Sequence, residues 1–260
     1  MTRACARENL VVLLRWKGKL LVLYGRLHVH DYLCSMHSTS LFSLSRSPFT
    51  YRLMQFEITS FANGDPIPHE FAFCIPADTG HVTLGVNKNP HVRWSGAPEG
   101  TQSFALICCD TEVPSVGDDV NQEGRTVPYD LPRVDFFHWV LVDIPTNVTE
   151  IAAGAACDGV TPKGKPVGPT THGVQGRNDY TAWFDGDPDM GGTYGGYDGP
   201  CPPWNDERRH RYVFTLYALD VSSLGLKGAF GGQDARDALA GHVLAEASWE
   251  GTYALYPDAH

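Results

Sequence analysis

The sequence predicts a mainly β protein built as a single large domain. Two observations support this. After Met54 the chain consists mostly of short runs of strand-forming residues, separated by Gly, Pro, Asn and Asp. Three of these runs are almost entirely apolar, which is typical of strands that are covered on both faces. We therefore expect these three strands at the centre of one sheet, in a chain long enough to bury a continuous core.

The individual elements follow from local patterns. The predicted strands are Gln55–Ser60, Ser103–Cys109, Phe137–Ile144, Tyr212–Leu219 and Ala247–Leu255. Within the second strand, the neighbours Cys108 and Cys109 should point to opposite faces of the sheet. One helix is predicted over Ala235–Ala247, which carries Leu239, Val243 and Leu244 among several alanines. Asp234 precedes this run and can cap its first turn.

The stretch Gly186–Pro203 is the most unusual in composition, since ten of its eighteen residues are Gly or Pro. Such a segment can form neither a helix nor a central strand. Its aromatic residues Tyr194 and Tyr197, with Trp204 directly after it, indicate a loop that is packed against the domain.

Charge excludes one class of partner. The 260 residues contain 20 Lys and Arg against 30 Asp and Glu, a formal net charge of -10. Nucleic-acid backbones are bound by basic surfaces, so no nucleic-acid partner is expected. No apolar run approaches the ~20 residues that a spanning helix needs, so no membrane span is expected either.

The first 53 residues differ from the rest of the chain. They contain eight basic and two acidic residues, a net charge of +6, whereas residues 54–260 have a net charge of −16. Met54 opens an orderly strand-like pattern. We therefore interpret 1–53 as a basic appendage, disordered or an over-extended start, that adds no strand to a domain spanning 54–257. A transit peptide is the alternative for this Arg-rich leader.

Seven cysteines are present, and no C-x-x-C pair occurs among them. A zinc ribbon or a thioredoxin-type site is therefore not expected. The simplest interpretation is that the thiols are reduced, which favours a cytoplasmic location. The triplet Asp185, Asp187 and Asp189 is similar to the start of a calcium loop, but its twelfth position is Gly196 instead of Glu. We therefore expect no metal and no cofactor.

Three polar residues border the apolar strands. Asp110 ends one strand, His138 begins the next, and His210 begins a third, directly after the Gly/Pro-rich loop. Strand ends beside loops are common positions for ligand-binding groups. Imidazoles can donate hydrogen bonds to an anion, and a carboxylate can orient an imidazole. The three residues therefore predict an anion-binding pocket.

The motifs around these residues resemble those of the phosphatidylethanolamine-binding protein family, in its bacterial Raf kinase inhibitor-like (YbhB/YbcL) type. The resemblance covers about 56–255 and excludes 1–53. Its most specific part is Gly199-Pro200-x-Pro202-Pro203 followed by His210-Arg211-Tyr212. The other motifs are Asn87-x-x-Pro90-x-x-x-Trp94-Ser95-Gly96-x-Pro98, Ser103-Phe104-Ala105-Leu106, Asp110-x-x-x-Pro114, His138-Trp139-Val140, Tyr217-Ala218-Leu219 and Gly241-His242-Val243-Leu244-Ala245.

The resemblance implies a fold and a site. The fold is a large central sheet packed on a smaller one, with few peripheral helices. The site is a pocket for phosphate or phosphorylated head groups. Its expected ligand-binding residues here are Asp110, Glu112, His138, Cys201, Pro202, His210 and Tyr212. The family's Asp-Pro-Asp motif reads Asp110-Thr111-Glu112 in this chain. The long stretch between Pro114 and His138 is expected to form a loop over the pocket mouth.

Two functions follow from these residues. The first is a binding protein for an anionic small ligand that regulates a partner protein, by resemblance a kinase. The alternative is a hydrolase or transferase that uses Asp110, His138 and His210 for acid–base chemistry. That enzyme would need a nucleophile, and Cys201 is the candidate. No G-x-S-x-G motif occurs, which argues against an α/β-hydrolase. We therefore expect no enzyme activity.

Overall fold

The computed structural model describes residues 10–16, 19–25 and 53–260. Its contacts divide the chain into two units, Met1–Phe49 and Thr50–His260. In the first unit, β1 (Leu10–Trp16) pairs antiparallel with β2 (Lys19–Gly25) in a two-stranded sheet. The sequence analysis did not predict these strands. The remainder of the appendage prediction falls largely on residues outside those that the structure describes, and it stays a prediction.

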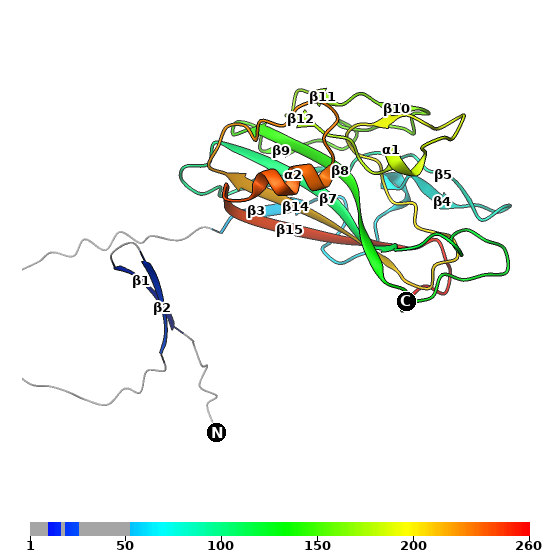
Figure 1. Cartoon of the computed structure of the whole chain (residues 1–260), viewed down its shortest axis with the longest axis horizontal. Coiled ribbons are helices and arrows are strands. Elements are labelled where there is room, and N and C mark those ends of the chain that lie inside the picture. The colour runs from blue at the N-terminus through cyan, green and yellow to red at the C-terminus, as the bar shows by residue number, and fades with distance from the viewer. Residues whose placement is uncertain (1–9, 17–18, 26–52) are drawn as a thin grey trace, which may run out of the picture. The chain divides into compact units, whose positions relative to one another are not determined.

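A six-stranded antiparallel sheet is the main element of the second unit (Figure 1). Its order is β11 (Gly168–Pro169), β12 (Val174–Gln175), β8 (Arg133–Pro145), β7 (Ser103–Pro114), β14 (His210–Leu219) and β15 (Val243–Tyr253). The three predicted apolar strands are β7, β8 and β14, and they occupy adjacent positions inside the sheet. The prediction of a mainly β fold with a large central sheet is confirmed.

Both faces of this sheet are covered, which explains why its central strands are apolar throughout. On one face, Leu106 and Cys108 share a core with Phe56 and Trp94 of the smaller sheet. That sheet consists of β3 (Gln55–Ile58), β6 (Val92–Ser95) and β9 (Glu150–Ile151). On the other face, Cys109 shares a second core with α2 (Gly232–Leu239) and its neighbouring loops. Cys108 and Cys109 thus point to opposite faces, as predicted.

Small elements complete the unit. They are the short helices η1 (His69–Phe71) and α1 (Tyr180–Trp183), and the strands β4 (Cys74–Pro76), β5 (Val82–Leu84), β10 (Gly164–Lys165) and β13 (Thr193–Tyr194). No helix in the part of the chain that the structure describes is long and apolar enough to cross a membrane.

The predicted helix is wrong at both ends. Helix α2 begins at Gly232, earlier than expected, where the Asp234 side chain accepts a hydrogen bond from the Gly231 amide. It ends at Leu239, and Val243 already belongs to β15. Gly241 has a φ of 85°, a left-handed conformation that favours glycine. The chain therefore turns there and enters β15 through residues that the sequence analysis placed in the helix.

Candidate functional site

His210 lies at the start of β14, between two carboxylates, and is fully buried. Its Nδ1 is 2.6 Å from Asp110 Oδ2, and its Nε2 is 3.1 Å from Asp206 Oδ2. Burial lowers the pKa of His210, but the charges and hydrogen bonds of Asp110 and Asp206 outweigh burial and raise it to about 9. His210 is therefore a cation at neutral pH, and each ring nitrogen donates to one carboxylate.

Asp206 connects this histidine to a buried arginine. Arg133 donates to both carboxylate oxygens of Asp206, at 2.6 and 3.0 Å. Burial opposes the charged form of Asp206, but the hydrogen bonds from His210 and Arg133 hold its pKa below the usual range. Asp110, His210, Asp206 and Arg133 thus form a continuous buried chain of ion pairs, which we call the acid–base chain.

His138, on β8, is buried and differs from His210 in charge. Its Nδ1 is 2.8 Å from the backbone oxygen of Asp198, to which it can only donate. Burial lowers the pKa of His138, and the nearby Asp110 opposes this only in part. His138 is therefore neutral at pH 7, with its proton on Nδ1 and a lone pair on Nε2.

The Asp198 backbone that fixes His138 is itself held firmly. The Asp198 carboxylate accepts hydrogen bonds from Asn87 at 2.8 Å, from Asn178 at 2.8 Å and from Lys165 at 2.6 Å. All its oxygen atoms are thus engaged in structural bonds. Asp198 orients His138 and has no free oxygen to offer a ligand.

Tyr212, two residues after His210, brings an unpartnered hydroxyl to the same place. Its side chain is almost fully buried, and its OH makes no well-formed hydrogen bond with the described residues, although the carboxylate of Asp110 lies close to it. Burial, followed by the charge of Asp110, raises the pKa of Tyr212 well above its usual value. The phenol therefore keeps its proton and can donate a hydrogen bond. A buried hydroxyl without a partner is costly, which makes it a marker for a missing ligand or water.

Asp110, His138, His210 and Tyr212 line a cavity of about 450 Å³. The rest of its lining is mostly apolar and aromatic, and includes the following: Phe73, Cys74, Leu84, Val113, Pro114, Ser115, Val116, Gly117, Val120, Asn121, Phe136, Tyr180, Trp183, Phe184, Met190, Cys201, Pro202 and Pro203. This size and composition are typical of a small-molecule site. The structure therefore brings six of the seven predicted site residues to one cavity: Asp110, His138, Cys201, Pro202, His210 and Tyr212.

Glu112 is the predicted site residue that does not line the cavity. Its carboxylate binds Arg208 at 2.7 Å and Arg211 at 2.9 Å. The pairing of β7 with β8 is irregular between Asp110 and Val113, so the regular alternation of side chains is lost at Glu112. Glu112 serves an ion-pair cluster with Arg208 and Arg211, and its part in ligand binding stays a prediction.

Cys201 is also not the free thiol that we expected. It forms a disulfide with Cys74 on β4, 127 residues earlier in the chain. The expectation of reduced thiols is therefore wrong for this pair, and it loses its force as an argument for a cytoplasmic location. Spacing could not reveal the pair, because residues this far apart meet only through the fold.

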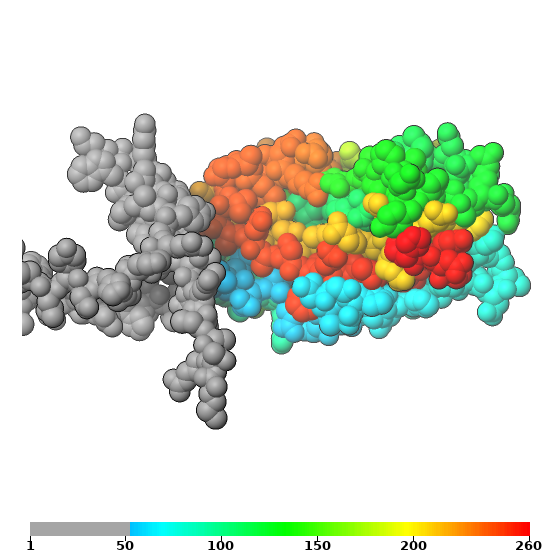
Figure 2. All heavy atoms as spheres, turned by 90° about the horizontal axis from the view of Figure 1, so that it is seen from below, coloured from blue at the N-terminus to red at the C-terminus, as the bar shows by residue number. Residues whose placement is uncertain are grey.

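The loop 115–132 reaches the cavity and is shorter than the predicted loop, because Arg133–His138 already belong to β8. That it covers the mouth stays a prediction. Ser115, Val116, Gly117, Val120 and Asn121 all line the cavity. Its far part is anchored by the C-terminus, because the rings of Tyr129 and His260 stack at 4.9 Å. Figure 2 shows the C-terminal residues, in red, lying against this green loop. The loop is thus fixed at a point away from the cavity.

The structure adds site residues that the sequence analysis missed, namely Asp206, Arg133 and Cys74. Asp206 lies four residues before His210, which was the one available signal. The triplet Asp185, Asp187 and Asp189, which is similar to the start of a calcium loop, has a structural role in its own turn. The Asp187 carboxylate accepts hydrogen bonds from the backbone amides of Asp189 and Met190. Among residues 53–260 and the two described strands before them, no cluster of three His, Cys, Asp or Glu side chains could hold a metal.

Comparisons with known proteins agree with this geometry. A family model described as phosphatidylethanolamine-binding protein matches residues 57–254. A UPF0098 protein of Aquifex aeolicus is 31% identical over 202 residues, covering 77% of this chain and 88% of the relative. UPF0098 protein YbcL of Escherichia coli strain K12 is 29% identical over 199 residues, covering 75% of this chain and 83% of YbcL.

Two crystal structures are similar to the fold. One is E. coli YbcL, described as a new member of the mammalian PEBP family, with a TM-score of 0.56 and 26% identity over 78% of this chain and 99% of YbcL. The other is a putative phosphatidylethanolamine-binding protein homolog of Chlamydia trachomatis, with a TM-score of 0.52 and 26% identity over 77% of this chain and 97% of the homolog. On the match of the family model to most of its length, the chain belongs to the phosphatidylethanolamine-binding protein family.

Proposed function

We propose that the cavity binds a small amphiphilic ligand whose polar end is a phosphate or another anion. The observation that carries this proposal is the buried hydroxyl of Tyr212, which makes no well-formed hydrogen bond and lines the cavity together with His138. A donor buried without a partner is satisfied when a ligand supplies an acceptor.

The negative charge of Asp110 does not exclude an anion from the cavity, because neighbouring positive charges balance it. The acid–base chain holds two carboxylates and two cations, because His210 is protonated and Arg133 pairs with Asp206. Its net charge is therefore zero, and Asp110 presents a neutralised carboxylate. An incoming anion meets the Tyr212 hydroxyl and the lone pair of His138 Nε2. Protonation of that nitrogen converts it into a second donor, so binding should draw a proton onto His138.

The size and walls of the cavity indicate the body of the ligand. A phosphate alone fills a small part of 450 Å³, and most of the lining is apolar. Leu84, Val116 and Trp183 line the cavity and are each more than half exposed, so they lie where it meets the solvent. A ligand with an apolar body covers these walls and gains the free energy of their removal from water.

Calorimetric titration with hexyl phosphate, inorganic phosphate and hexanol separates the two parts of this proposal. Hexyl phosphate should bind at least about tenfold more tightly than either partial probe, since each buried methylene contributes about 0.8 kcal/mol. Tyr212→Phe should weaken hexyl phosphate about ten- to a hundredfold, the usual loss of a hydrogen bond to a charged group. His69→Ala is the control, because His69 packs on Tyr253 and does not line the cavity. Equal affinity in wild type and Tyr212→Phe would contradict the proposal.

The alternative function, a hydrolase or transferase, no longer has a candidate nucleophile. The Cys201 sulfur is bonded to Cys74, and both nitrogens of His210 are engaged by carboxylates. These contacts leave His138 as the free acid–base group of the three that we considered. Regulation of a partner protein such as a kinase stays a prediction from the family resemblance. A cytoplasmic location also stays a prediction, and the disulfide weighs against it.

A further inference from the structure

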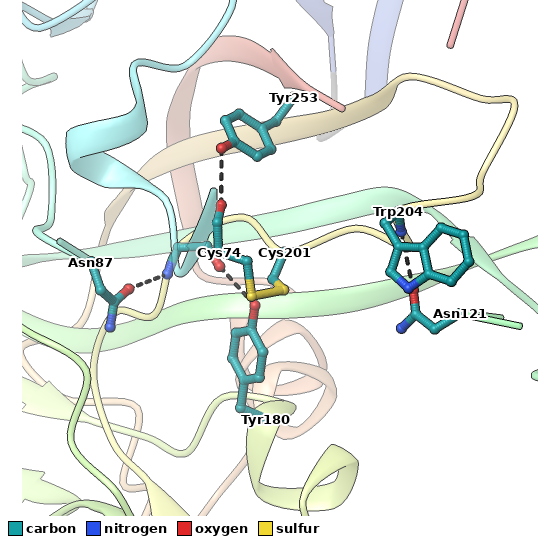
Figure 3. Close-up of a disulfide and its surroundings, with 8 residues drawn as sticks. Cys74, Asn87, Asn121, Tyr180, Cys201, Trp204 and Tyr253 are labelled. Carbon is teal, nitrogen blue, oxygen red and sulfur yellow. Dashed lines mark hydrogen bonds between the residues drawn. A yellow bond between two sulfur atoms is a disulfide. The ribbon is translucent and has the colours of Figure 1, made fainter. Parts of the chain in front are cut away.

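A disulfide forms part of the wall of the ligand cavity. Both Cys74 and Cys201 line it, with Pro202 and Pro203 directly after the second cysteine. The two residues differ in exposure, since Cys74 is buried and Cys201 is half-buried. Figure 3 shows the bond beside Tyr180, another cavity residue. A small molecule inside the cavity therefore lies next to a sulfur–sulfur bond.

The backbone around this bond does not depend on it alone. The Tyr180 hydroxyl donates to the Gly199 carbonyl at 2.8 Å, and the Gly199 amide donates to the Asn87 side chain at 2.8 Å (Figure 3). The amides of Phe73 and Cys74 both donate to the Pro200 carbonyl, at 2.9 and 3.1 Å. The loop that carries Cys201 is thus held by hydrogen bonds to Cys74 of β4 and to Phe73, Asn87 and Tyr180 outside that strand. Cleavage of the disulfide would leave these bonds in place.

We propose that the cavity is a covalent capture site for low-molecular-weight thiols. The incoming thiol gives up its proton, and its sulfur attacks Cys201 Sγ, because Cys201 is the more exposed of the two residues. The Cys74–Cys201 bond breaks, a new bond joins the thiol to Cys201, and the electron pair of the broken bond passes to Cys74 Sγ. Cys74 takes up one proton in exchange for the one released. The sum is the addition of one whole thiol molecule, with no other oxidant or reductant.

Two features of the cavity favour this step. The neutral Nε2 of His138 lines the same cavity and can accept the thiol proton, which produces the reactive thiolate. The free cysteines in the described part of the chain are buried: Cys108, Cys109 and Cys157. Burial raises the pKa of Cys109 to about 12 and that of Cys157 to about 11, so these thiols do not compete at neutral pH.

The test compares two thiols on the oxidised wild-type protein. One is 2-mercaptoethanol, which is small enough for the cavity, and the other is a folded protein with a single surface cysteine, which is not. The mixtures are quenched with acid at intervals, and intact mass and peptide mapping identify the adduct. We expect 2-mercaptoethanol to add once, on Cys201, at a rate at least about tenfold above that of the protein thiol. Far-ultraviolet circular dichroism should stay unchanged.

Equal rates for the two thiols would overturn the proposal, because a thiol too large for the cavity would then react as fast as one that fits. An adduct at Cys108, Cys109 or Cys157 would overturn it too, because these cysteines do not line the cavity. The absence of any adduct would overturn it as well. Cys201→Ser serves as a second check, since it removes the attacked sulfur and should abolish the adduct. The result is independent of the anion proposal, whose titrations use the oxidised protein without thiols.

Discussion

Replacement of His210 by glutamine should destabilise the protein in a way that depends on pH. In the folded state the pKa of His210 is about 9, because Asp110 and Asp206 outweigh the effect of burial. In the unfolded chain a histidine has a pKa of about 6.5. The raised value means that protonation of His210 favours the folded state. This stabilisation is complete below pH ~6.5 and is lost as pH rises through 9.

The magnitude follows from the two pKa values. Each unit of difference is worth about 1.4 kcal/mol, so the full effect is roughly 3 kcal/mol. Glutamine is uncharged at every pH and cannot supply this contribution. The difference in unfolding free energy between wild type and His210→Gln should therefore shrink by roughly 3 kcal/mol between pH 6 and pH 10.

Urea unfolding at equilibrium, measured without reductant at unit steps across this range, gives both free energies. Groups distant from His210 titrate alike in both proteins, so their effects cancel in the difference. His69→Gln is the matched control and should show a constant difference. A wild-type minus His210→Gln difference that stays constant within ~0.5 kcal/mol would refute the ionic structure of the acid–base chain.

Three further outcomes are expected. Tyr212→Phe should leave stability unchanged or slightly raised in the absence of ligand, because the hydroxyl is buried without a partner; thermal unfolding with and without hexyl phosphate checks this. Joint replacement of Cys74 and Cys201 by serine should lower the unfolding free energy by about 2–5 kcal/mol, because the disulfide closes a long loop, as urea unfolding would show. Gly199→Ala should severely reduce folded yield, since its Cβ would lie 2.0 Å from the Phe71 carbonyl oxygen.

Each of these has an outcome that contradicts it. A stability loss above ~1 kcal/mol for Tyr212→Phe would indicate a partner for the hydroxyl. An unchanged midpoint for the cysteine pair would mean that the bond contributes nothing to the folded state. Gly225→Ala is the control for Gly199→Ala, because its Cβ meets no atom within 4 Å. Gly225 has a φ of 72°, so a modest loss is expected there from backbone strain.

The centre of the fold was predictable because burial leaves a clear mark on sequence. Strands β7, β8 and β14 are covered on both faces, so their residues are apolar without alternation. Asp110 and His138 are polar residues that interrupt this pattern, and both reach the cavity. The sequence analysis placed them at strand ends, but they lie within β7 and β8, because both strands continue beyond them. The end of the helix was not predictable, because the apolar residues Val243 and Leu244 fit a helix as well as a strand.

The protonation states of His138 and His210 could not be predicted from the sequence. From their sequence positions, His138 and His210 are both expected to donate to one anion. The fold separates them, since His210 lies between two carboxylates and His138 bonds only to a backbone carbonyl. One is therefore a cation and the other is neutral. This difference depends on Asp206 and on the backbone of Asp198. The spacing of Asp206 from His210 was the one available signal, and it does not reveal that the two side chains form an ion pair.

The uptake of a proton on ligand binding tests the central claim most directly. Hexyl sulfate is the appropriate probe, because it is an anion that does not itself titrate near neutrality. Calorimetric titration at pH 7 in two buffers with different enthalpies of ionisation gives the number of protons bound. We predict that wild type takes up about one proton per hexyl sulfate and that His138→Gln takes up none. Binding without proton uptake, equal uptake in His138→Gln, or the absence of binding would contradict an anion site in which His138 becomes a donor.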